Sequence, residues 1–137
     1  MKLPKPAADG PALTQSPTMH DPTPAHLPGW HLLLDLYGAR HLTDAARLGA
    51  ILSAAAKAAG AQVIHAQVHA FPGRAGVTGV VLLAESHISI HTWPELGLAA
   101  VDIFMCGAAD VDAARLYIET ALTPTRVHAT KLERGRS

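Results

Sequence analysis

The segment from Leu82 to Glu95, LLAESHISIHTWPE, holds more reactive side chains than a purely structural strand needs. It contains the tripeptide Glu85–His87, followed by His91 and by the tripeptide Trp93–Glu95. Because histidine and carboxylate side chains bind metal ions in proteins, a metal site is the first chemistry to consider.

The backbone that the segment predicts argues against a metal site built from Glu85, His87 and His91. On a helix, His87 and His91 would share one face. However, Ile88 and Ile90 alternate with polar residues, and β-branched residues in alternation predict a strand. Four residues of strand span about 13 Å, which is too far for one ion to bridge. We therefore expect no metal, and the structural alternative is a half-buried strand with one polar face.

Two aromatic side chains indicate a pocket for a flat ring. Trp93 ends the predicted strand close to Glu95, and Phe71 ends another strand before the loop PGRAG. Two such rings beside a glycine-rich loop could sandwich a heterocycle, although aromatic residues at strand ends are also common in cores and interfaces. The single cysteine, Cys106, follows the next strand, and a lone cysteine is more often inert packing than a reactive group. The residues alone name a pocket and no reaction.

The elements that must position these side chains follow the order β-α-β-β-β-β-α-β. Strands are expected at residues 30–37, 62–71, 79–84, 88–93, 98–104 and 126–132. The first helix is capped by Thr43 or Asp44 and ends at Gly60. The second runs from a cap at Asp110 through Leu122. This order predicts an α+β fold, a two-layer sandwich with a mainly antiparallel sheet and two helices on one face. The other face then needs a cover, which a second subunit can supply.

Side-chain periodicity assigns faces to two of these elements. The first helix places its apolar residues on one side, which we expect to pack on the sheet: Leu48, Ile51, Leu52, Ala55 and Ala59. Simple alternation in the strand at 62–71 puts on one face Val63, His65, Gln67, His69 and Phe71. It puts on the other face Ile64, Ala66, Val68 and Ala70.

Composition fits one domain, residues 29–137, that follows a proline-rich arm. Residues 1–28 hold most of the 10 prolines and little periodicity, which predicts a disordered extension. Eleven basic and 11 acidic residues give zero formal charge and no electrostatic case for nucleic acid or an anionic membrane. One cysteine excludes an intrachain disulfide. Because no apolar run could span a bilayer and no signal peptide is evident, we expect a cytoplasmic protein.

The motif ESHISIHTWPE closely resembles the prokaryotic S-adenosylmethionine decarboxylase proenzymes, a pyruvoyl-dependent and self-processing family. The likeness continues through residues 76–107, GVTGVVLLAESHISIHTWPELGLAAVDIFMCG, and extends more loosely from Trp30 to the C-terminal ERGR. It combines a Glu-Ser-His core, a His-Thr-Trp-Pro-Glu run and a cysteine 11 residues after that glutamate. This combination is specific, and it covers nearly all of the chain except the proline-rich arm.

The resemblance implies cleavage of the Glu85–Ser86 bond into a β chain, residues 1–85, and an α chain, residues 86–137. The Ser86 hydroxyl attacks the Glu85 carbonyl, and the resulting ester loses the Glu85 carboxylate by β-elimination. The dehydroalanine hydrolyses to a pyruvoyl group and ammonia. By the same likeness His91 is the base for the elimination. Thr78, where the family usually has serine, assists processing through its hydroxyl.

The resemblance further implies decarboxylation of S-adenosylmethionine on the pyruvoyl group, with no pyridoxal phosphate and no metal. The substrate amine forms a Schiff base with residue 86, CO₂ leaves, and Cys106 returns a proton to the former α-carbon. Phe71 and Trp93 stack on the adenine, and Glu95 accepts hydrogen bonds from the ribose. The product is decarboxylated S-adenosylmethionine, an aminopropyl donor for spermidine and polyamine biosynthesis.

The spacing of Ser86 and His91 leaves a question of geometry. On a straight strand they would lie roughly 16 Å apart and on opposite faces. Either the chain turns at Glu85–His87, or a neighbouring subunit supplies a partner. Because the family's active sites lie at a dimer interface, the resemblance implies a homodimer of processed units.

Two other functions compete with this interpretation. Relatives with the same self-processing core decarboxylate arginine or ornithine, and the loop FPGRAGVTG, a residue longer than is usual in the family, leaves that substrate class open. The chain could also be an unprocessed, non-catalytic partner of a related enzyme. Such a partner would have no reason to keep Ser86, His91 and Cys106 together.

Overall fold

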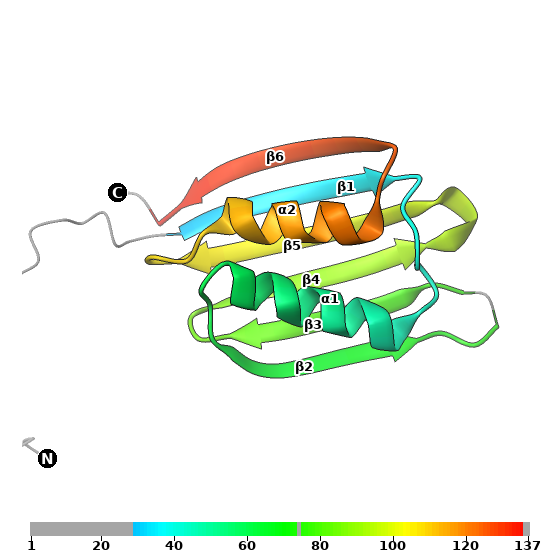
Figure 1. Ribbon diagram of the computed structural model, residues 1–137, viewed down its shortest axis with the longest axis horizontal. Coiled ribbons are helices and arrows are strands. Elements are labelled where there is room, and N and C mark those ends of the chain that lie inside the picture. The colour runs from blue at the N-terminus through cyan, green and yellow to red at the C-terminus, as the bar shows by residue number, and fades with distance from the viewer. Residues whose placement is uncertain (1–28, 74, 136–137) are drawn as a thin grey trace, which may run out of the picture.

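Apolar residues at every second position of the central strands build one face of a six-stranded antiparallel sheet (Figure 1). The computed structural model describes residues 29–73 and 75–135. The strands are β1 (Gly29–Tyr37), β2 (Val63–Ala70), β3 (Val77–Leu83), β4 (Ser86–Trp93), β5 (Leu98–Cys106) and β6 (Arg126–Arg134). Their order across the sheet is β2-β3-β4-β5-β1-β6, so β1 inserts between the chain's last two strands. A short 3₁₀ helix, η3 (Pro94–Leu96), follows β4.

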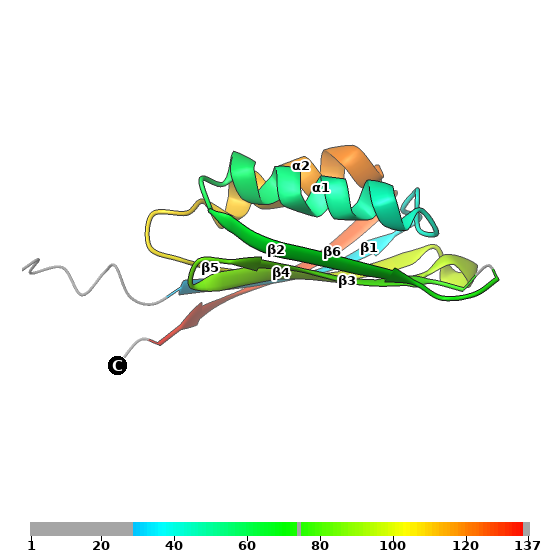
Figure 2. The same ribbon diagram turned by 90° about the horizontal axis from the view of Figure 1, so that it is seen from below.

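The two helices, α1 (Ala45–Ala58) and α2 (Val111–Leu122), cover the same face of the sheet (Figures 1 and 2). Together with the sheet they form the predicted two-layer α+β sandwich, and the predicted element order is confirmed. All five residues of the predicted apolar face of α1 are buried, and Ala56 joins them. Within residues 29–73 and 75–135, no helix is long and apolar enough to cross a membrane.

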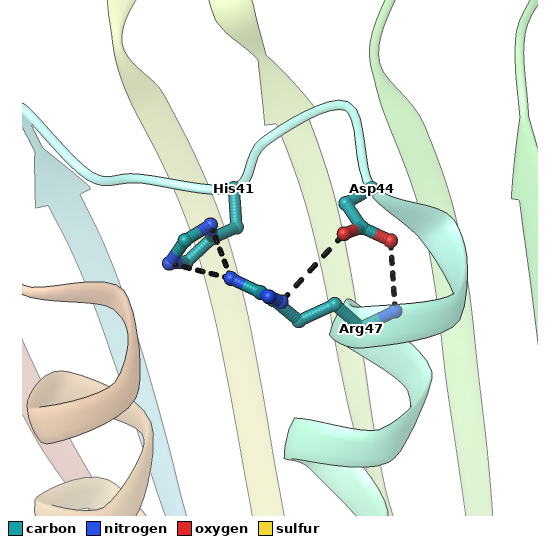
Figure 3. A network of polar contacts seen from close by, with 3 residues as sticks. All are labelled: His41, Asp44 and Arg47. Atoms are coloured by element: carbon teal, nitrogen blue, oxygen red, sulfur yellow. Dashed lines mark hydrogen bonds and ion pairs between the residues drawn. The ribbon is translucent and has the colours of Figure 1, made fainter.

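Aspartate side chains start both helices. Of the two candidate caps of α1, the structure selects Asp44, whose carboxylate accepts a 3.0 Å hydrogen bond from the Arg47 backbone N–H. The Arg47 guanidinium also lies 3.6 Å from Asp44 and 2.9 Å from a ring nitrogen of His41, which ties down the loop before α1 (Figure 3). Asp110 caps α2 by accepting from the N–H groups of the second and third residues after it, at 3.0 and 3.1 Å.

Strand β2 departs from the predicted alternation. Its register against β3 shifts between Val63 and His65, so Ile64 is an extra residue. Val63 and Val68 both pack against the core, whereas simple alternation had placed them on opposite faces. A bulge leaves one residue outside the regular pairing, and the Ile64 side chain is 64% exposed. The face assignment for the start of this strand was therefore wrong.

Among the described residues, no helix covers the sheet face opposite α1 and α2 (Figure 2). Strand alternation places polar and aromatic side chains there, and we call this surface the open face. The open face includes His31 and Asp35 of β1, Thr78 of β3, His87, Ser89, His91 and Trp93 of β4, Asp102, Phe104 and Cys106 of β5, and His128 of β6. The predicted disordered extension, residues 1–28, lies outside the described residues.

Candidate active site

The Glu85–Ser86 bond lies in the tight turn between β3 and β4. Glu85 has a φ of 70°, in the left-handed region that is costly for any residue with a Cβ, by on the order of 1–2 kcal/mol. Ser86 is the first residue of β4, and its hydroxyl lies 3.5 Å from the carbonyl oxygen of Ala84. Backbone strain of this kind often marks functional positions, and here it coincides with the bond predicted to break.

Cys106, at the end of β5, contacts the same turn. Its thiol donates a hydrogen bond of 3.4 Å to the carbonyl oxygen of Glu85. Burial raises the pKa of the Cys106 thiol above its ordinary value, and the negative charge of the Glu85 side chain raises it further. Across the ladder Gly29 faces Cys106, and a Cβ there would come 3.0 Å from the sulfur. The site therefore holds a protonated thiol against the carbonyl group that Ser86 would attack.

A second group of predicted residues gathers at the other end of β4. His91 faces Thr78 across the ladder between β3 and β4, and the threonine hydroxyl lies 3.2 Å from Nδ1 of His91. The ring of Trp93 lies 6.4 Å from the His91 ring, and its side chain is 40% exposed. Glu95 follows in η3, and Phe71, 47% exposed, follows β2 at this end of the sheet.

One chain does not bring the two groups together. Ser86 pairs with Leu83 at one end of the hairpin, and His91 pairs with Thr78 near the other. The chain turns at Ala84 and Glu85, before Ser86, and β4 then runs without interruption to Trp93. In the hairpin of β3 and β4, the chain therefore makes no further turn after Ser86 that would bring His91 back to it. Within one chain the predicted site consists of two halves.

Sequence reasoning missed a ring cluster beside the turn at Ala84 and Glu85. The ring centroids of His31, His87 and Phe104 lie 5.7 to 6.4 Å apart. Arg134, at the end of β6, donates a 3.1 Å hydrogen bond to Nδ1 of His31. Nε2 of His31 lies 3.8 Å from the Asp102 carboxylate. The only signal in the sequence was the Arg-containing ERGR segment, which no local pattern connects to β1.

The residue types at the turn are those that formation of a pyruvoyl group requires. Over residues 29–73 and 75–135, no group of three or more histidine, cysteine, aspartate or glutamate side chains could hold a metal. A pyruvoyl group needs a serine whose hydroxyl can reach the preceding carbonyl. Ser86 directly follows the strained Glu85, so the serine hydroxyl and the preceding carbonyl belong to the same turn.

Comparisons with known proteins agree with this fold. The family model described as S-adenosylmethionine decarboxylase matches residues 30–135. This chain therefore belongs to the S-adenosylmethionine decarboxylase family, and residues 1–29 lie outside the match.

The relatives are similar over most of their length. The S-adenosylmethionine decarboxylase proenzyme of Moorella thermoacetica is 44% identical over 111 residues, which cover 78% of this chain and 87% of the relative. The proenzyme of Aquifex aeolicus is 46% identical over 110 residues, with 78% and 81% covered. The crystal structure of the adenosylmethionine decarboxylase from Aquifex aeolicus superposes with a TM-score of 0.72 at 42% identity, covering 80% of this chain and 92% of that one.

Proposed function

We propose that this chain is a self-processing S-adenosylmethionine decarboxylase that makes its pyruvoyl group from Ser86. The observation that carries the proposal is the reactive turn. It combines a left-handed Glu85, the adjacent Ser86 hydroxyl and a thiol hydrogen bond from Cys106 to the Glu85 carbonyl oxygen. Family membership supports the decarboxylase activity, and the names of the relatives support S-adenosylmethionine over arginine or ornithine.

The turn has the groups that the first processing step needs. When the Ser86 hydroxyl attacks the Glu85 carbonyl carbon, the carbonyl oxygen gains negative charge. The Cys106 thiol already donates to that oxygen and would stabilise the charge. The ester that forms releases the strained peptide at Glu85. A base must then remove the Ser86 α-proton so that the Glu85 carboxylate can leave, and water converts the resulting dehydroalanine to pyruvoyl and ammonia.

The base for this elimination is His91, and we propose that it comes from a second copy of the chain. The Thr78 hydroxyl holds the His91 ring by a 3.2 Å contact, yet both lie at the far end of β4 from Ser86. Two copies packed open face to open face about a two-fold axis would place the His91 end of one against the Ser86 end of the other. The uncovered open face supports such a homodimer.

The same packing would complete the substrate site. The pyruvoyl group, when formed, captures the substrate amine and accepts the electrons that the departing CO₂ leaves behind. Cys106 lies beside residue 86 and, with its raised pKa, keeps a proton to return to the former α-carbon. Phe71 and Trp93, both half-exposed, would hold the adenine, and Glu95 would accept hydrogen bonds from the ribose. Within the same proposal, the enzyme is cytoplasmic and its product serves spermidine synthesis.

Mixing two inactive variants tests the two-chain site. His91→Ala keeps Ser86 and Cys106 but lacks the base, and Ser86→Ala keeps the base but cannot be cleaved. If the site is shared, unfolding and refolding the two together should restore cleavage of the His91→Ala chain. Each variant refolded alone is the control. If a mixture that size-exclusion chromatography shows to be dimeric does not regain cleavage, the result would contradict a shared site. The family assignment would still stand.

A further inference from the structure

Self-cleavage creates a mechanical problem at residue 86. Before cleavage the residue is held on both sides, by the turn at Glu85 and by the rest of β4. After cleavage it is a chain terminus, and terminal residues fray unless other contacts hold them. Catalysis needs the reactive carbonyl held to within about half an ångström. Something other than the broken bond to Glu85 must therefore fix the start of β4.

The ring cluster lies where such an anchor is needed. His87 directly follows residue 86, and its ring centroid lies 5.9 Å from Phe104 and 6.4 Å from His31. The His31 ring meets the Phe104 ring edge to face at 5.7 Å. The three residues come from β4, β5 and β1, so the first ring of the new chain packs against two strands that cleavage leaves intact.

Arg134, at the end of β6, holds the His31 ring within this cluster. Arg134 donates to its Nδ1 at 3.1 Å, and the Arg134 guanidinium also lies 5.7 Å from the centre of the Phe104 ring. Because Nδ1 accepts this bond, a neutral His31 carries its hydrogen on Nε2. Among the described residues, Nε2 of His31 is buried without a hydrogen-bond partner, and Asp102 at 3.8 Å is too distant to serve as one.

A buried nitrogen without a hydrogen-bond partner lowers stability, so the presence of a histidine at position 31 needs an explanation. The hydrogen bond from Arg134 holds the His31 ring in one orientation, in which it makes T-shaped contacts with the rings of Phe104 and His87. We propose that His31 is a positioning residue that anchors the terminus at residue 86 after cleavage, acting through His87 and Phe104. This inference rests on the proposed self-processing function.

The chain supplies a matched control on the same face. His128 of β6 lies 3.8 Å from the Asp35 carboxylate, the same separation as between His31 and Asp102. Asp35 pairs with Ala100 along β5, away from the reactive turn. Replacing His128 with leucine therefore removes an equivalent histidine–aspartate contact without touching the ring cluster.

Amide hydrogen exchange of the peptide at residues 87–90 tests the anchor directly. It is compared in the cleaved protein and in the uncut Ser86→Ala chain, each with and without His31→Leu. We expect His31→Leu to accelerate exchange about tenfold or more in the cleaved protein, where a free terminus can open locally, and much less in the uncut chain. Arg134→Met should act in the same direction and, being exposed, serves if His31→Leu does not fold. His128→Leu should leave exchange at residues 87–90 unchanged.

Turnover gives a second readout. His31→Leu should cleave itself normally but lose kcat on the order of 10- to 100-fold, the effect of misplacing a reactive group by about 1 Å. Equal acceleration of exchange in cut and uncut chains, or acceleration in neither, would overturn the positioning role. So would a His31→Leu chain that folds but fails to cleave, because His31 would then act before the terminus exists. A wild-type chain that never cleaves would instead overturn the proposed function.

Discussion

The Cys106 thiol donates a 3.4 Å hydrogen bond to the carbonyl oxygen of Glu85, the residue that precedes Ser86. One contact thereby links β5 to the turn between β3 and β4. It places a proton donor at the oxygen that would gain charge during the proposed self-cleavage and, afterwards, beside the residue that would carry the pyruvoyl group. Burial, and after it the charge of Glu85, raises the pKa of the thiol, so the donor stays protonated.

Wild-type protein should separate into residues 1–85 and residues 86–137, and Ser86→Ala should stay one chain because it lacks the nucleophile. Intact-mass spectrometry should find the second fragment lighter by one ammonia than a peptide that starts with serine. Ser53→Ala, a serine of α1 on the opposite side of the sheet from the open face, is the control and should cleave like wild type. A fragment with an intact N-terminal serine would indicate simple hydrolysis and contradict cofactor formation.

The uncut Ser86→Ala chain lets the Cys106–Glu85 pair be titrated. Burial and then the Glu85 charge raise the pKa of the thiol, so the thiol stays protonated to a higher pH than an ordinary cysteine. Glu85→Gln removes the second cause and favours the thiolate. The midpoint of alkylation rate against pH should therefore move down, while staying above the ordinary value because burial persists. Glu119→Gln, on α2 and away from both ends of the site, should leave the midpoint unchanged, and an unchanged midpoint in Glu85→Gln would contradict the coupling.

His91→Ala should slow the elimination step by on the order of 10²–10⁴-fold, the usual contribution of a general base. The ester should then accumulate, and hydroxylamine should cleave it at residue 86. Thr78→Val removes the hydroxyl that contacts His91 at 3.2 Å and should slow processing less than loss of the ring. Thr78→Ser keeps a hydroxyl and is the matched control. Normal processing in His91→Ala would remove this histidine from the mechanism.

Thr92 links the site to the core through its buried hydroxyl. This hydroxyl donates to the Leu42 carbonyl at 2.7 Å and accepts from the Val77 N–H at 2.8 Å. Thr92→Val leaves both backbone groups without that partner, so the free energy of unfolding of the uncut chain should fall by about 2–4 kcal/mol. Thr92→Ser should retain most of it. Thr120→Val, which loses an exposed hydroxyl bond, should change little in the same denaturant titration.

Local features of the sequence predicted the elements, because their causes are local. Alternation around Ile88 and Ile90 gave β4, and Asp110 marked the start of α2. The bulge at Ile64 was not predicted, because one extra residue does not visibly change the alternation of polar and apolar residues in a short strand of mixed polarity. The motif also named the candidate site residues, from Ser86 to Cys106.

The spatial relations between those residues could not be read from the sequence, because they depend on strand pairing over long separations. His31 and Arg134 stand 103 positions apart and meet only because β1 lies between β5 and β6. The cluster of His31, His87 and Phe104 could therefore not be predicted from the sequence. By contrast, the separation of Ser86 and His91 was expected for a straight strand, and the uninterrupted β4 has that geometry.

Substrate preference is expected to follow the exposed aromatic side chains at the His91 end of the sheet. S-adenosylmethionine carries a purine and a ribose, which Trp93, Phe71 and Glu95 can recognise, whereas arginine and ornithine carry neither. Each aromatic contact contributes about 0.5–1.5 kcal/mol. Trp93→Ala should therefore lower kcat/KM for S-adenosylmethionine by about 2- to 13-fold, since 1.36 kcal/mol corresponds to a factor of ten. Its effect on any residual turnover of arginine or ornithine should be smaller.

The other tryptophan makes the substrate test specific. Trp30 is 42% exposed, close to the 40% of Trp93, but Lys131 lies over its ring at 4.8 Å, and it shares the helix side of β1 with Leu32. Trp30→Ala should leave the ratio of kcat/KM values between S-adenosylmethionine and arginine unchanged, whereas Trp93→Ala should lower it. Parallel assays of CO₂ release from S-adenosylmethionine, arginine and ornithine give that ratio. A higher kcat/KM for arginine or ornithine in the wild-type protein would overturn the substrate assignment, and the self-cleavage at Ser86 would still stand.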